Sequence, residues 1–244
     1  MDMNARTGVA AITAVATVVT VALAFSSVTA AAGTKSHPPN PWAGLSHAQK
    51  NAIVEQTHAQ NMKYLQDFEA RHGDPRSLPV IRIDTYQGPP ASFGSAAAHA
   101  TVVMQGVVRE VHFAADPNGG IPGMTASVNV TSVGRGALAG STIFVRQLGG
   151  PVARPNGRGA LMRLDGEELI LPGDHVVLLL TQPQPHVNLY RPVYGAGVYF
   201  LRNGVLAGEA ATRYGSLAGQ RLAATWRIMS SNQLSNTDLP LQLT

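Results

Sequence analysis

The chain has 244 residues, with 18 Lys and Arg against 14 Asp and Glu, and it contains no cysteine. The lack of cysteine excludes disulfides, thiolate metal sites, iron–sulfur clusters and thiol catalysis. Charged residues make up 13% of the chain, about half the usual share, which excludes a charge-rich coiled coil. The length allows one substantial domain with appendages, and the Val, Ile and Leu content of its middle argues against disorder throughout.

The first thirty residues have the pattern of a secretory signal. Arg6 ends a short polar start, an uninterrupted apolar run covers residues 8–25, and small residues follow it up to Ala31. A basic, an apolar and a small-residue region in this order predict export, with cleavage after Ala30. The apolar run also approaches the ~20 residues that span a bilayer, so a membrane anchor over 8–25 is the alternative.

A linker and a helix are predicted next. Residues 33–41 contain three prolines, which cannot continue a helix and therefore favour an extended linker. Ser46 and Gln49 have the capping-box spacing, in which each side chain bonds the other's free backbone N–H. We expect a loosely amphipathic helix over residues 46–73. Its far end carries a run of stop signals, namely Arg71, His72, Gly73 and Pro75.

From Val80 onward the pattern changes to short strands separated by turns rich in Gly, Pro and Asn. Gly106, inside the longest strand, predicts a bulge or bend. Asn203 followed by Gly204 predicts a type I′ hairpin turn, because that turn needs positive φ at both positions. With no helix between them, the strands favour an antiparallel barrel or sandwich. The predicted strands are 80–83, 101–113, 126–133, 141–148, 175–181, 189–194 and 197–201.

The segment LILPGDHVVLLL, residues 169–180, joins a polar turn to a continuous apolar run. Residues 172–174 are predicted to turn the chain, and residues 176–180 to form a strand buried on both faces. One wall of a ligand site is the alternative interpretation of this run. Near the end of the chain, apolar residues at helical spacing over 216–229 predict a helix that closes the barrel, with Ser216 as its N-cap.

Five segments in a fixed order carry a resemblance: VVMQGVVREV, ASVNVTSVGRG, STIFVRQLGG, LILPGDHVVLLL and GVYFLRNGVL. Over Ala100–Met229 the chain resembles small exported bacterial β-barrel domains, which are similar to OB-fold barrels of the netrin and metalloproteinase-inhibitor type. The resemblance implies a mainly β fold, a small antiparallel OB-like barrel with an N-terminal amphipathic helix and a C-terminal closing helix. It implies no activity. The animal inhibitors place an N-terminal cysteine on their target's metal, and this chain has none.

The predicted domains follow from these segments. They are a signal peptide or anchor at 1–30, a linker at 31–45, an amphipathic helix at 46–73, a β-barrel domain with its closing helix at 78–229, and a flexible tail at 230–244.

No local motif for catalysis or metal binding is present. The chain lacks a Gly-x-Ser-x-Gly elbow, a Ser-x-x-Lys pair, a His-Glu-x-x-His helix and a glycine-rich phosphate loop. The eight histidines have no ligand spacing, so neither a metal site nor a cofactor is expected. Residues 116–120, DPNGG, lack the repeated oxygen ligands of a calcium loop and are predicted to form a turn.

The middle of the chain has a charge asymmetry. No acid lies between Asp116 and Asp165, whereas five arginines do. Much of the segment is predicted to be a long loop, residues 149–166, and long loops are often functional. Arginine suits phosphate and carboxylate groups, so the candidates for binding an anionic partner are Arg146, Arg154, Arg158 and Arg163. A solvated loop, with its arginines paired to acids at 165–168, is the alternative.

Three functions remain open at this stage. The first is a non-enzymatic exported module that binds an anionic envelope polymer or another exported protein through the barrel surface and the arginine-rich loop. The second is a hydrolase whose groups converge in the fold, with His175, Asp174 and Glu168 as candidates. The third is a structural envelope protein with its helix as a spacer. Nucleic acid is not an expected partner, because the chain is exported and Phe144 is the only aromatic in the paired strands.

Overall fold

The computed structural model describes residues 42–84, 88–154, 158–182, 187–215 and 217–230. The chain divides into two compact units, 1–40 and 41–244, and all described residues belong to the second. The predicted signal segment, most of the linker and the tail after Ser230 lie outside the described residues. Within the described part, none of the helices combines the length and apolar character needed to cross a bilayer.

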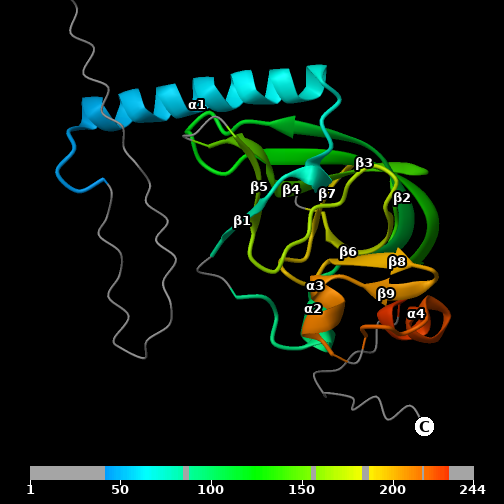
Figure 1. Cartoon of the computed structure of the whole chain (residues 1–244). Coiled ribbons are helices and arrows are strands. Elements are labelled where there is room, and N and C mark those ends of the chain that lie inside the picture. Colours follow the sequence, from blue (N-terminus) through cyan, green and yellow to red (C-terminus); the bar gives the residue numbers. More distant parts are fainter. Residues whose placement is uncertain (1–41, 85–87, 155–157, 183–186, 216, 231–244) are drawn as a thin grey trace, which may run out of the picture. The chain divides into compact units, whose positions relative to one another are not determined.

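The second unit is mainly β, as predicted, and its described residues form nine strands and a few helices (Figure 1). The strands are β1 (Val80–Ile83), β2 (Val102–Ala114), β3 (Gly123–Arg135), β4 (Thr142–Ala153), β5 (Gly159–Leu164), β6 (His175–Thr181), β7 (Leu189–Pro192), β8 (Val198–Arg202) and β9 (Val205–Ala207). The α-helices are α1 (His47–Ala70), α2 (Phe93–His99), α3 (Glu209–Arg213) and α4 (Leu222–Ser230).

Five of the strands close a barrel. β2 pairs antiparallel with β3 and with β6, and β3 pairs antiparallel with β4. Short β7 completes the ring, because it pairs parallel with β4 and antiparallel with β6. The other strands extend this barrel: β5 and β1 continue from β4, and β8 and β9 continue from β6. Of the two folds predicted from the sequence, a barrel or a sandwich, the structure therefore has the barrel.

The apolar run in β6 is buried on both faces. Val176, Leu178 and Leu180 belong to the core inside the barrel. Val177 and Leu179 face a second core that contains residues of α2, α3 and α4. All five side chains are fully buried. A strand between two cores has no polar face to present, and this explains why the run is continuous instead of alternating.

The turn before β6 also forms as predicted. Gly173 has φ +87, in the left-handed region that favours glycine. The Asp174 carboxylate accepts the Leu171 N–H at 2.7 Å, and the Asp174 N–H donates to the Leu171 carbonyl at 3.0 Å. The Asn203-Gly204 turn between β8 and β9 has φ +54 and +77, as a type I′ turn requires.

The predicted loop over residues 149–166 is wrong in its main part, because β4 continues to Ala153 and forms a hairpin with β5. Gly149 and Gly150 have φ +132 and +153, which lets β4 bend between the barrel and this hairpin. The apolar side chains of Val152, Ala160 and Leu161 are buried along the hairpin. The two adjacent glycines look like a loop signal in the sequence, but here they bend a strand.

α1 begins with the predicted capping box: the Gln49 N–H donates to Ser46 Oγ at 3.2 Å and the Ser46 N–H to Gln49 Oε1 at 2.9 Å. Its far end is closed by a Schellman motif, with the Gly73 N–H bonded to the Phe68 carbonyl and the His72 N–H to the Glu69 carbonyl. His72, and not the glycine, takes the left-handed φ of +50. Gly73 is needed for space, because a Cβ there would lie 2.4 Å from the Phe68 ring.

The predicted closing helix over 216–229 is correct only from Leu222 onward, where α4 begins. The preceding residues pair with the edge of β9: the Gly219 N–H donates to the Leu206 carbonyl, and the Leu206 N–H to the Gln220 carbonyl. Gly219 has φ +78, which no helix allows. Ser216, the predicted N-cap, lies outside the described residues.

Candidate functional site

The outward side of β4 exposes a mixed row of side chains. Phe144 is 45% exposed and Leu148 is 44% exposed, with Arg146, also exposed, between them. Ile143 and Val145, which flank Phe144 in the sequence, are fully buried in the barrel core. Because successive residues of a strand point to opposite faces, the three exposed side chains lie on one side of the barrel wall.

The neighbouring strand β3 offers only short polar side chains beside this row. Ser127 lies opposite Phe144 and Thr125 lies opposite Arg146 in the antiparallel register. Both are partly exposed, and they alternate with buried residues of the core. We call these five outward side chains, Thr125, Ser127, Phe144, Arg146 and Leu148, the β3–β4 face. It combines a ring, a cation, an aliphatic group and two hydroxyls.

The four arginines proposed from the sequence are not gathered in one place. Arg146 is exposed on the barrel, whereas Arg154 and Arg158 flank the hairpin turn, where the Arg154 N–H donates to the Arg158 carbonyl at 2.8 Å. Arg146 and Arg154 are eight residues apart, a path of roughly 26 Å along a strand that rises ~3.3 Å per residue and that bends at Gly149 and Gly150 between them. A single small anion cannot contact both, but an extended polymer can.

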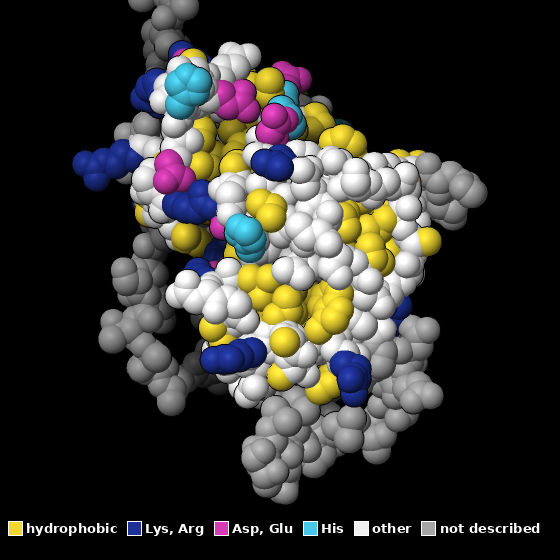
Figure 2. Space-filling view, turned by 90° about the vertical axis from the view of Figure 1, so that its right-hand side faces the viewer, with side chains coloured by type: hydrophobic (Ala, Val, Ile, Leu, Met, Phe, Trp, Pro, Cys, Tyr) yellow, Lys and Arg dark blue, Asp and Glu magenta, His cyan; other side chains and the backbone are white. Residues whose placement is uncertain are grey.

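Basic side chains are also dispersed elsewhere on the surface. Figure 2 shows one face of the molecule, where hydrophobic side chains gather in patches and Lys and Arg lie singly around them. The net charge of +4 therefore does not form a dense basic patch on that face.

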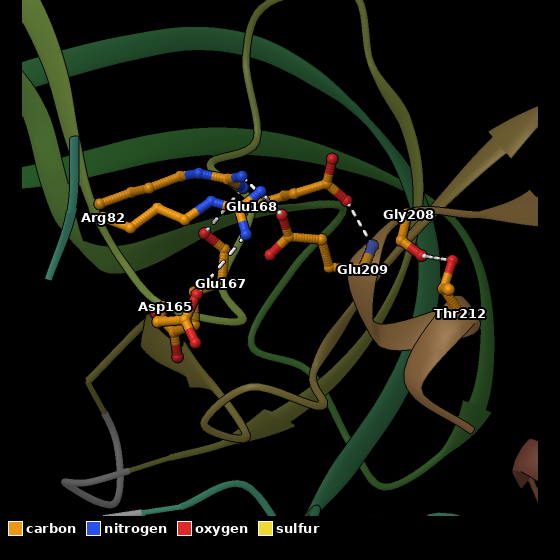
Figure 3. Close-up of polar contacts among 8 residues, drawn as sticks. Arg82, Asp165, Glu167, Glu168, Gly208, Glu209 and Thr212 are labelled. Atoms are coloured by element: carbon orange, nitrogen blue, oxygen red, sulfur yellow. Dashed lines mark hydrogen bonds and ion pairs between the residues drawn. The ribbon is translucent and has the colours of Figure 1, made fainter. Parts of the chain in front are cut away.

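Arg163 belongs to an internal ionic cluster. Its side chain is 10% exposed, and Nη2 lies 2.6 Å from Glu209 Oε1. Arg82 of β1 lies 2.8 Å from the same carboxylate oxygen and 3.6 Å from Asp165 Oδ1 (Figure 3). Glu209 thus bridges two guanidinium groups from neighbouring strands. Charge-assisted hydrogen bonds of this kind are the strong ones, and they fix the start of α3 to β1 and β5.

Two more carboxyl groups complete this ionic cluster. Glu168 Oε2 accepts the Glu209 N–H at 2.7 Å, which caps α3 in place of a side chain from Gly208 (Figure 3). Glu167 Oε1 accepts the Gly195 N–H at 3.3 Å. Burial raises the pKa of the Glu167 carboxyl, and the hydrogen bond from Gly195 opposes this effect. The ionic cluster ties the C-terminal part of the fold to the β1–β5 edge.

A small pocket opens beside Glu167 and Glu168, lined also by Gly195, Ala196 and Val198. It has room for about one water molecule. That space is too small for a substrate-sized molecule.

The three residues of the hydrolase alternative serve separate contacts. Asp174 Oδ1 lies 2.9 Å from Arg76 Nη2, and its other oxygen closes the turn before β6. Glu168 caps α3. His175 is exposed at the start of β6, opposite Val107 of β2. Nowhere among the described residues do three His, Asp or Glu side chains meet in a group that could hold a metal ion.

The exposed row on β4 could be predicted from the sequence, whereas the ionic cluster could not. The exposure of Phe144 and Arg146 follows from the alternation within the predicted strand 141–148. The bridging role of Glu209 had no local signal, because its partners are 46 and 127 residues away. Only the fold brings β1, β5 and α3 together.

Comparison of the chain with protein-family models and with curated proteins found no match.

Proposed function

We propose that this protein is an exported, non-enzymatic binding module that contacts an anionic envelope polymer through Arg146 of β4 and through Arg154 and Arg158 of the β4–β5 hairpin. Arg146 and Arg158 are exposed and Arg154 is half-buried. The observation that carries the proposal is the position of Arg146 on the β3–β4 face, with Arg154 and Arg158 further along the same hairpin. Their spacing suits a chain-like anion better than a small one. We leave Arg163 out of the proposed binding surface, because its nearly buried guanidinium group is paired with Glu209.

We further propose that the barrel is of the OB type. Its closed strand order, β2-β3-β4-β7-β6, and its parallel β4–β7 pair support this assignment. Barrels of this type bind ligands on the face of their second and third strands, which correspond to β3 and β4 here. The proposed site therefore lies where such a fold accommodates an extended ligand.

The signal-like segment at 1–30 supports export, either with cleavage near Ala30 or with anchoring by residues 8–25. Either outcome leaves the module at the cell envelope or outside the cell. An anionic polymer of the envelope is then attracted by the protein's net charge of +4.

The test is co-sedimentation of the full-length protein with purified envelope material across a salt series. We expect binding that falls steeply with salt, because exposed charges are screened within about 10 Å at 0.1 M salt. The triple variant Arg146→Gln, Arg154→Gln, Arg158→Gln should bind about tenfold more weakly at low salt, at about 0.5 kcal/mol for each ion pair lost.

A second triple variant, Arg202→Gln, Arg221→Gln, Arg227→Gln, is the matched control. It removes the same three charges from exposed arginines elsewhere on the chain. Equal losses in the two variants would show that net charge alone drives association and would contradict the proposed site. Binding that resists salt and both variants would indicate a specific protein partner instead.

A further inference from the structure

Phe144 has an unusual position for an aromatic side chain. It lies inside a strand of the closed barrel, is 45% exposed, and has Ser127 of β3 on one side and Leu189 of β7 on the other. Burying such a ring contributes about 1.5–3 kcal/mol, so an outward position forgoes a large stabilisation. Among the large hydrophobic side chains that are exposed on the described strands, Phe144 is the aromatic one.

We propose that the polymer bound at the β3–β4 face is a glycan, with a sugar ring against Phe144 and the ring's carboxylate or phosphate group on Arg146. This inference rests on the proposed function and names the class of its ligand. The C–H faces of a sugar ring carry partial positive charge, and the face of an aromatic ring is negative. The guanidinium group supplies a planar fork for the anionic substituent.

The spacing of the two side chains suits one sugar unit. Phe144 and Arg146 are two residues apart on the same side of β4, which places their Cα atoms about 6.6 Å apart. Ser127 and Thr125 lie directly opposite them and provide hydroxyl groups at the same two positions. A sugar ring that stacks on Phe144 therefore has its hydroxyl groups beside Ser127. The charged substituent of that sugar reaches Arg146, beside Thr125.

Other anionic partners fit this face less well. A membrane surface would meet Glu110, which is exposed and in register with Ser127, in the same row as Phe144. A flat anionic bilayer must cover this whole row and is repelled by the acid, whereas the glycan proposed has its charged group in the Arg146–Thr125 row. A protein interface needs a broad apolar centre. Here the apolar neighbours of Phe144 are Leu189, which is only partly exposed, and Leu148, which Arg146 separates from it. Single-stranded nucleic acid stacks on successive aromatic side chains, and this face has one.

The experiment measures binding of the full-length protein to three immobilised polymers by biolayer interferometry. Polygalacturonate carries a carboxylate on each sugar ring, its methyl ester carries the ring without the charge, and linear polyphosphate carries charge without a ring. We expect the wild-type protein to prefer polygalacturonate. Phe144→Leu, which keeps an apolar side chain but removes the ring, should weaken polygalacturonate binding about three- to tenfold and leave polyphosphate binding unchanged.

Val133→Ala is the matched control, because Val133 is also 45% exposed and lies on β3 outside the β3–β4 face. It should change binding to each polymer less than about twofold, and thermal unfolding should show that both variants fold. Equal weakening by the two variants, or equal loss of polyphosphate binding in Phe144→Leu, would overturn the ring-stacking inference. If the arginine variants lose binding while Phe144→Leu does not, the proposed function stands and the glycan assignment falls. Failure of the wild-type protein to bind either anionic polymer would overturn both.

Discussion

At the scale of single residues, Glu167 gives the fold a pH dependence. Its side chain is nearly buried, and burial raises the pKa of the carboxyl above its ordinary value of about 4.5. The folded state therefore holds this proton more tightly than the unfolded state. Stability from this group is fully present below the ordinary pKa and is lost as the pH rises through the raised pKa.

The variant Glu167→Gln tests this effect. The amide oxygen can still accept the Gly195 N–H, but the group no longer ionises. We expect the variant to be more stable than the wild type at pH 7 in urea unfolding, with the difference shrinking toward pH 4. Asp67→Asn, at an exposed site on α1, is the control for removal of an acid and should change the free energy of unfolding by less than about 0.5 kcal/mol. A constant difference between wild type and Glu167→Gln across this pH range would contradict the assignment.

At the scale of secondary-structure elements, the sequence was most informative where the signals are local. The capping box of α1, the turn before β6 and the Asn203-Gly204 hairpin each depend on a few consecutive residues, and each forms. The bend in β4 was missed, because adjacent glycines favour a loop unless a distant strand pairs beyond them. The outward row of Phe144 and Arg146 was predictable from alternation. The burial of Arg163 was not, since its acid is on α3.

The bend in β4 should be sensitive to a single methyl group. A Cβ on Gly149 would lie 2.7 Å from the Met162 carbonyl oxygen, and φ is +132. We expect Gly149→Ala to lower the free energy of unfolding by about 1–3 kcal/mol in urea titration. Gly123→Ala is the control, because its added Cβ would meet nothing closer than 3.9 Å, and it should change stability by less than about 0.5 kcal/mol. Similar effects of the two substitutions would show that β4 needs no special φ at this position.

At the scale of the whole molecule, Glu209 connects parts of the described unit that are far apart in the sequence. Arg82 is 127 residues before it and Arg163 is 46 residues before it, and both donate to the same carboxylate oxygen. Removing the charge leaves the nearly buried Arg163 without its carboxylate. We expect Glu209→Gln to lower the free energy of unfolding by about 2–4 kcal/mol, somewhat below the cost of breaking a fully buried pair.

The cause of that loss can be separated from simple loss of contacts. Adding Arg163→Met to Glu209→Gln removes the uncompensated charge, so the double variant should recover about half of the lost stability. Asp67→Asn breaks the exposed Lys63–Asp67 pair on α1, and its effect should stay below about 0.5 kcal/mol. A double variant that is less stable than Glu209→Gln would mean that Arg163 packs the β5–α3 junction through its aliphatic stem. Recovery would instead show that most of the loss in Glu209→Gln comes from the charge left on Arg163 without its carboxylate.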